Sequence, residues 1–102
     1  MVISINNQNN QIAEIEEVMV NNRLFEKFNL TKVGVFGSAA RGEHSNDIDI
    51  LIEENIDYRL LLTLRDELQD LMNKRIDVVI AKYANPIVLR RTLKEIVYVT
   101  RH

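Results

Sequence analysis

Hydrophobic residues recur every three to four positions in three segments of the chain. The first segment extends from Gln11 to Phe28, the second follows Asp57, and the third follows Asn85. Such spacing places the apolar side chains on one face of an amphipathic helix. Asp57 and Asn85 are predicted N-caps, and Pro86 suits the first helical position. The predicted apolar faces comprise Ile12, Ile15, Met19, Phe25 and Phe28, then Leu61, Leu64, Leu68 and Leu71, then Leu89, Leu93 and Ile96.

Short apolar runs between the predicted helices indicate β-strands. The predicted strands are Val33–Phe36, Asp47–Ile52 and Arg75–Ala81, residues 39–44 are predicted to form a short helix or a turn, and residues 97–99 form one more short apolar segment. The order is therefore helix, strand, helix, strand, helix, strand, helix, abbreviated αβαβαβα. This order predicts an α+β fold, with three or more short strands covered by helices. The pattern leaves the direction of strand pairing open.

The composition is that of a folded globular domain. The chain has 102 residues, of which 46% are hydrophobic and 27% are charged. This is enough apolar material for one compact core, and the length suits one domain. We expect residues 11–102 to form that domain. We expect the first ten residues, which end in a run of Asn and Gln, to be disordered.

Charge and cysteine content narrow the functional classes. The formal net charge is −2 and the basic residues are scattered, so a long nucleic acid is not the expected partner. The absence of cysteine excludes disulfides and thiolate metal sites. Neither a signal-peptide pattern nor an apolar stretch near the roughly 18 residues of a membrane span is present. We therefore expect a cytoplasmic protein that does not interact with membranes.

Two aspartates of the second predicted strand are candidate metal ligands. Because side chains alternate along a strand, Asp47 and Asp49 lie on one face, and Ile48 and Ile50 lie on the other. The two Asp Cα atoms are then about 6.6 Å apart, which is twice the strand rise. A divalent cation would remove the repulsion between the carboxylates, and oxygen ligands suit Mg²⁺ or Mn²⁺. The alternative is that the pair lies on a solvated face.

Asp77 is a third candidate, in the apolar third strand. An unpaired charge in such a strand is costly. A carboxylate there can complete a metal site or accept a proton from an attacking hydroxyl. The alternative is an exposed aspartate, or one paired with Lys74 or Arg75.

The Gly37-Ser38 turn is a candidate phosphate-binding element. Glycine allows the backbone to approach a ligand closely, and free N–H groups after a strand attract phosphate. The alternative is an ordinary turn in which Ser38 is an N-cap. Arg41 follows in the same turn region and can reach a triphosphate or pair with Glu43.

Together these residues resemble the minimal nucleotidyltransferases of the DNA polymerase beta superfamily. The resemblance is carried by Val35–Glu43, Asp47–Leu51, Ile76–Val79 and Ile87–Val99, and it extends from about Ile12 to the last residue. It implies the nucleotidyltransferase fold, with a small mixed sheet covered by helices. It also implies transfer of a nucleoside monophosphate from a nucleoside triphosphate to a hydroxyl group, with release of pyrophosphate.

The resemblance assigns a role to each motif. It implies that the catalytic and metal-binding residues are Asp47, Asp49 and Asp77, and that the nucleotide-binding residues are Gly37, Ser38 and Arg41. ATP is the expected substrate and Mg²⁺, or Mn²⁺, the expected cofactor. Such a site supplies the positioning and charge neutralisation that phosphoryl chemistry requires.

The resemblance also implies a partner protein. Similar proteins are paired with HEPN-family toxins in toxin–antitoxin modules, where the nucleotidyltransferase is the antitoxin and attaches AMP to a tyrosine of the toxin. One alternative is an antitoxin that neutralises its partner by binding alone. It is favoured by the eight-residue connection 39–46, which is shorter than is usual in the family. A second alternative is transfer to a small molecule, for which a homodimer can supply the pocket.

Overall fold

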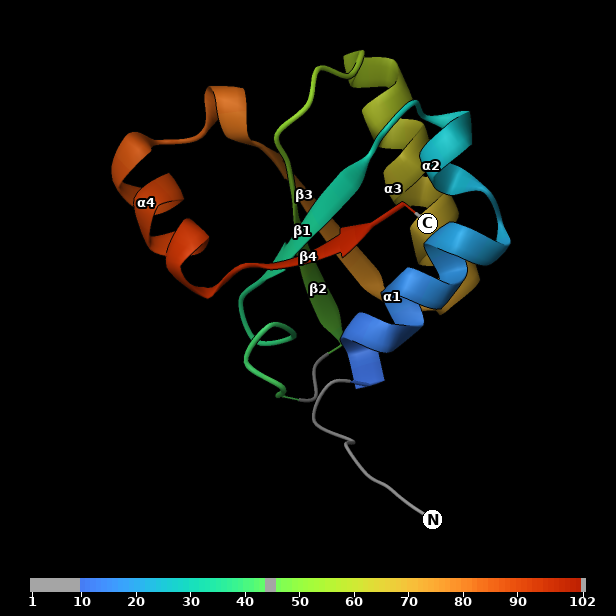
Figure 1. Ribbon diagram of the computed structural model, residues 1–102, viewed down its shortest axis with the longest axis horizontal. Helices are drawn as coiled ribbons and strands as arrows, with labels where there is room; N and C mark the ends of the chain where they lie inside the picture. Colours follow the sequence, from blue (N-terminus) through green and yellow to red (C-terminus); the bar gives the residue numbers. More distant parts are fainter. Residues whose placement is uncertain (1–9, 44–45, 102) are drawn as a thin grey trace.

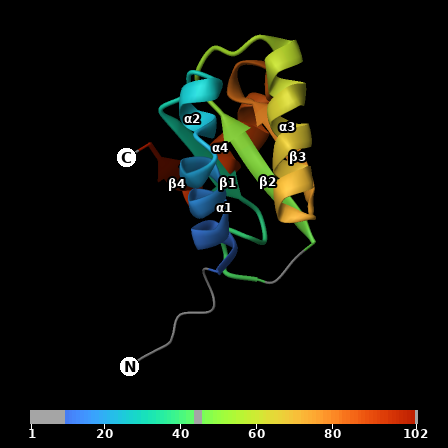
Figure 2. The same ribbon diagram turned by 90° about the vertical axis from the view of Figure 1, so that its right-hand side faces the viewer.

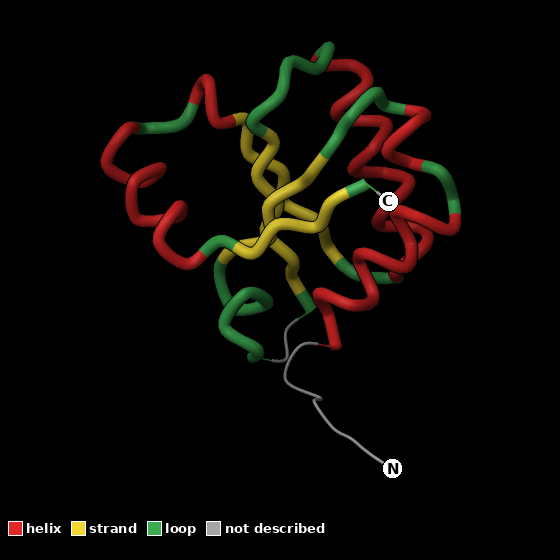
Figure 3. The backbone as a smooth tube through the Cα atoms, in the orientation of Figure 1, coloured by secondary structure: helices red, strands yellow, loops and turns green. Residues whose placement is uncertain are grey.

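The computed structural model describes residues 10–43 and 46–101. The elements are α1 (Asn10–Asn21), α2 (Leu24–Lys27), β1 (Lys32–Phe36), β2 (Asp47–Ile52), α3 (Tyr58–Met72), β3 (Arg75–Ile80), α4 (Pro86–Glu95) and β4 (Val97–Thr100), with a 3₁₀ turn at Ala81–Tyr83 before α4 (Figure 3). The disorder predicted for the first ten residues falls on residues 1–9, outside the described part, while residue 10 begins α1. No helix within the described ranges has the length and apolar character of a membrane span.

The four strands form one mixed sheet in the order β3-β2-β1-β4. β2 pairs with β3 in parallel, whereas β1 pairs antiparallel with both β2 and β4. The parallel pair is possible because α3 forms the crossover that such a connection needs. Helices α1, α2 and α3 lie on one side of the sheet and α4 lies on the other (Figures 1 and 2). The predicted α+β class, with a small mixed sheet covered by helices, is confirmed.

Alternation along β2 separates a buried face from a polar face. Ile48, Ile50 and Ile52 are fully buried, whereas Asp47 is exposed and Asp49 is half-buried. The isoleucines belong to a core that also includes Ile15, Met19, Phe25, Val35, Leu64, Leu68 and Ile76. Burying side chains of this size stabilises the fold by about 1.5–3 kcal/mol each before the entropy cost. The opposite face, with the aspartates, lies on the side of α4.

The predicted caps of α3 and α4 are present. The Asp57 carboxylate accepts a hydrogen bond from the Arg59 N–H at 2.8 Å. The Asn85 side chain accepts from the Ile87 N–H at 2.9 Å, directly before Pro86 at the start of α4. Caps of this kind satisfy backbone donors that have no partner within the helix. These two helices therefore begin where the sequence predicts.

Two predicted elements differ in detail, and a third resolves an alternative. The segment from Gln11 to Phe28 is not one helix, because the chain turns at Arg23, with φ of 55°, to form α1 and α2. Of the two forms predicted for residues 39–44, a short helix or a turn, the described residues 39–43 adopt the turn. The short apolar segment after α4 is a fourth strand, which pairs with β1.

The buried face of α3 ends one residue later than predicted. Leu61, Leu64 and Leu68 are buried as expected, but Leu71 is 47% exposed and Met72 is only 5% exposed. Three turns of an α-helix contain about 10.8 residues. The position eleven residues after Leu61 therefore faces the core better than the position ten residues after it.

Candidate active site

The turn after β1 is closed by its own backbone. Gly37 has φ of +71°. The Arg41 N–H donates to the Gly37 carbonyl at 3.2 Å, and the Glu43 N–H donates to the Ser38 carbonyl at 2.9 Å. Ala39, which is 2% exposed, anchors the turn in the core. Ser38 does not cap a helix, since the described residues after it form a turn. The turn is therefore fixed at the end of β1.

Gly37 lies directly against the carboxylate of Asp49. A Cβ added at Gly37 would be 2.4 Å from Asp49 Oδ2, closer than real Cβ atoms approach. The neighbouring Phe36 is the partner of Asp49 in the pairing of β1 with β2. Glycine is thus required twice, for the positive φ and for the close approach. The pairing of β1 with β2 therefore sets the Gly-Ser turn against Asp49.

The three predicted carboxylates lie on one face of two adjacent strands. Asp49 and Asp77 are direct partners in the parallel pairing of β2 with β3, and Asp47 precedes Asp49 by two residues. Paired strands are about 4.8 Å apart, and residues two apart on a strand share a face. The fold therefore brings Asp47, Asp49 and Asp77 together from positions separated by up to 30 residues in the sequence.

The electrostatics of this face centre on Asp49. Partial burial raises the pKa of Asp49, and the neighbouring charges of Asp77, Asp47 and Glu95 raise it further. The guanidinium of Arg41 opposes this shift in the pKa of Asp49 but does not cancel it. The ligand-free face thus holds more negative charge than it can accommodate without cost.

The carboxylates fit a divalent cation by chemistry. Oxygen donors in this number suit Mg²⁺, and a cation would relieve the repulsion around Asp49. Within residues 10–43 and 46–101, no three acidic or histidine side chains are already arranged as a metal site. Asp77 instead pairs with Arg75 at 3.4 Å, which is the alternative considered for it above. A cation would therefore compete with Arg75 for the Asp77 carboxylate.

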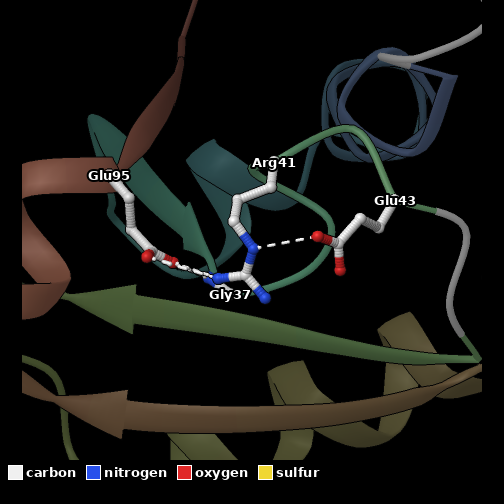
Figure 4. Close-up of polar contacts among 4 residues, drawn as sticks. All are labelled: Gly37, Arg41, Glu43 and Glu95. Atoms are coloured by element: carbon white, nitrogen blue, oxygen red, sulfur yellow. Dashed lines mark hydrogen bonds and ion pairs between the residues drawn. The ribbon is translucent and has the colours of Figure 1, made fainter.

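Arg41 lies between two carboxylates (Figure 4). Its Nε is 3.2 Å from Glu43 Oε2, one of the two alternatives that the sequence leaves open, and its Nη1 is 3.1 Å from Glu95 Oε2. The hydrogen bond to Glu43, followed by the charges of Glu43 and Glu95, raises the pKa of Arg41. Arg41 is half-exposed, and its charge acts on Asp49.

Glu95 is a residue that the sequence analysis did not single out. It is the last residue of α4, and its carboxylate accepts a hydrogen bond from the Gly37 N–H at 2.8 Å. One feature of the sequence could have indicated it. An acidic residue at the C-terminal end of a helix opposes the helix dipole, and such local conflicts accompany functional positions.

Comparison with known proteins places this arrangement in a family. Residues 13–101 match the family described as polymerase beta, nucleotidyltransferase. Protein adenylyltransferase MntA of Thermococcus cleftensis is 34% identical over 94 residues, which cover 86% of this chain and 95% of that protein. A Methanocaldococcus jannaschii relative, whose name also refers to protein adenylyltransferase, is 35% identical over 95 residues, covering 86% of this chain and 97% of that protein.

Solved structures share the fold. A minimal nucleotidyltransferase matches with a TM-score of 0.66 at 26% identity, covering 93% of this chain and 98% of that chain. A toxin–antitoxin structure with AMP-PNP matches with a TM-score of 0.66 at 22% identity, covering 85% of this chain and 73% of that chain. The sheet order, the Gly-Ser turn against Asp49 and these matches agree: the chain belongs to the polymerase beta nucleotidyltransferase family.

Proposed function

We propose that this chain is a Mg²⁺-dependent nucleotidyltransferase that transfers AMP from ATP to a tyrosine of a HEPN-family toxin, and so acts as a cytoplasmic antitoxin. Relatives are named protein adenylyltransferases, and structural neighbours are described as toxin–antitoxin complexes. The observation that carries the proposal is the contact of the Gly37 turn with Asp49, itself the register partner of Asp77. A phosphate-binding turn and an acidic face are thus adjacent.

In this proposal the turn and Arg41 bind the triphosphate. The backbone N–H groups at Gly37 and Ser38 can donate to anionic oxygens, as successive N–H groups in a turn do. Arg41 adds a guanidinium, whose charge-assisted hydrogen bonds to phosphate are about twice as strong as neutral ones. The turn's own hydrogen bonds and the buried Ala39 hold these donors in place before the nucleotide arrives.

Asp47, Asp49 and Asp77 would hold the divalent cations. A bound Mg²⁺ supplies charge neutralisation and orientation of the phosphates. Asp77 is also the carboxylate suited to accept the proton of the attacking hydroxyl, because β3 is an edge strand and the Asp77 side chain is 47% exposed. The tyrosine oxygen forms a bond to the α-phosphorus, the bond between the α- and β-phosphates breaks, and pyrophosphate leaves.

The test is intact mass spectrometry of a HEPN-family protein encoded beside this chain. It is incubated with this protein, ATP and Mg²⁺, and Asp49→Asn is the matched control. A mass increase of whole AMP units that the variant does not produce supports the proposal. Peptide mapping then identifies the modified residue.

An unmodified partner that still forms a stable complex would contradict the proposed transfer. It would favour the alternative, an antitoxin that neutralises its partner by binding alone. Cell protection by Asp49→Asn gives the same distinction, since an antitoxin that acts by binding does not need the carboxylate.

A further inference from the structure

The position of Glu95 is fixed by the pairing of β4 with β1. Val35 pairs with Val97 in an antiparallel register, so continuing that register by two residues places Glu95 opposite Gly37. Ile96 lies between Glu95 and Val97 in the sequence and packs over Gly34. A Cβ added at Gly34 would be 2.2 Å from Ile96 Cδ1. The end of α4 is thus anchored on β1, and Glu95 is directed at the turn.

Glu95 occupies a small anion receptor. Its Oε2 accepts a hydrogen bond from the Gly37 N–H at 2.8 Å and from Arg41 Nη1 at 3.1 Å, and its Oε1 is 3.3 Å from the same Nη1 (Figure 4). One backbone N–H and one guanidinium are the donors that a phosphate oxygen would use. A carboxylate oxygen accepts from these donors in the same way.

The location of Glu95 is unfavourable apart from these contacts. It is at the C-terminal end of α4, where the helix dipole disfavours negative charge. It is also close enough to Asp49 for the two charges to repel. The hydrogen bonds from Gly37 and Arg41 offset both costs, so Glu95 and the donors hold each other in place.

We propose that Glu95 occupies the position of a nucleotide phosphate in the nucleotide-free protein and is exchanged for that phosphate when nucleotide binds. The inference rests on the nucleotide site of the proposed function and adds a positioning residue to it. The single N–H of Gly37 cannot donate strongly to both the Glu95 carboxylate and a phosphate, so nucleotide binding displaces Glu95. Before binding, Glu95 keeps the turn and Arg41 arranged for an anion, and its competition lowers the affinity for nucleotide.

The test compares two variants that each neutralise one partner of Arg41. Glu95→Gln removes the carboxylate charge that would compete with phosphate for the Gly37 N–H. Glu43→Gln removes the carboxylate charge that pairs with Arg41 Nε, and it keeps the hydrogen bond from the Gly37 N–H to Glu95. The probe is α,β-methylene ATP, in which the bond broken during transfer is blocked. Its affinity is measured by calorimetry, with and without Mg²⁺.

Glu95→Gln is expected to bind the probe about three- to tenfold more tightly, since a neutral amide competes less well than a carboxylate and does not repel the phosphates. Glu43→Gln is expected to change the affinity less than about twofold, as for an exposed ion pair. The melting temperature of Glu95→Gln should not rise. A merely structural role would instead lower affinity and stability together.

Equal gains in affinity for the probe in both variants, or no gain in Glu95→Gln, would overturn the proposed exchange of Glu95 for phosphate. Neither result would contradict the proposed function. Absence of binding to all three proteins would overturn the nucleotide site and this inference with it. A second measurement needs no variant. In the wild-type protein, the side-chain carboxyl ¹³C signal of Glu95 and the amide signal of Gly37 should both shift as the probe saturates. An unmoved Glu95 signal would overturn the exchange.

Discussion

Replacing Asp49 by asparagine is expected to stabilise the ligand-free fold while abolishing nucleotidyl transfer. Burial and the nearby carboxylates raise the pKa of Asp49 above its ordinary value. The folded protein therefore holds the proton more tightly than the unfolded chain, and the ionised carboxylate opposes folding above the raised pKa. That cost disappears as the pH falls through the raised pKa. Asparagine removes the charge with almost no change in volume.

Burial is the largest cause of the raised pKa of Asp49, and the repulsion that adds to it can be sized from the spacing of the strands. Asp77 is the direct partner of Asp49 on the adjacent strand, so the charges are about 5 Å apart. At that distance two unit charges repel by about 0.8 kcal/mol in water and by about twice as much at half that dielectric constant. The face is largely open to solvent, which favours the lower value. A gain of about 1 kcal/mol corresponds to a rise in melting temperature of roughly 4–8 °C for a domain of this size.

Thermal unfolding followed by circular dichroism measures this gain at neutral pH without divalent cations. Asp70→Asn, at an exposed position of α3, is the control and should change the stability by less than about 0.5 kcal/mol. Addition of Mg²⁺ should raise the melting temperature of the wild type more than that of Asp49→Asn. A variant that melts at or below the wild-type temperature without metal would refute the reasoning, because Asp49 would then be stabilised by its surroundings.

Three further substitutions test the turn after β1, the carboxylate at the start of β1 and the cap of α4. Gly37→Ala should cost about 1–2 kcal/mol from its φ of +71° and more from the contact with Asp49, so chemical denaturation should show a larger loss than in Gly42→Ala, where φ is +79°. Burial raises the pKa of Glu54, but hydrogen bonds from Thr31 and Lys32 outweigh burial and lower it. Its contribution is therefore present above its ordinary pKa and is lost as the pH falls through the lowered value, so Glu54→Gln should be about 1 kcal/mol less stable than the wild type at neutral pH and equally stable in acid. Asn85→Ala should destabilise α4 by about 1 kcal/mol, and amide hydrogen exchange in α4 would measure it.

The elements that follow from local chemistry could be predicted from the sequence. The caps of α3 and α4 depend on one side chain and the N–H groups two or three residues later, so Asp57 and Asn85 are recognisable. Alternation in β2 likewise separates Asp49 from Ile48 and Ile50. The turn between α1 and α2 is also indicated by the sequence. The spacing from Met19 to Phe25 is six residues, which does not continue a helical face.

The parts that depend on pairing between distant segments could not be predicted from this pattern. The strand β4 is a short apolar segment until it pairs with β1, and the parallel register of Asp49 with Asp77 comes from the crossover through α3. Glu95 belongs to the same class, since its contact with Gly37 spans 58 residues. A side chain recruited by sheet register leaves no spacing motif in the sequence.

The acidic face of the site favours a cation, and the Gly37 turn with Arg41 favours an anion. The two parts are in direct contact. Asp47, Asp77 and Glu95 surround Asp49 with negative charge, and Arg41 is the cation that opposes it. A triphosphate bound at the proposed site would add negative charge beside this face, so nucleotide alone would have to overcome both this repulsion and the competition of Glu95. In the proposed site a divalent cation would remove the repulsion, and a phosphate that displaces Glu95 would free the Glu95 carboxylate. Cation and nucleotide should therefore strengthen each other's binding by the same factor, as linkage between two sites requires.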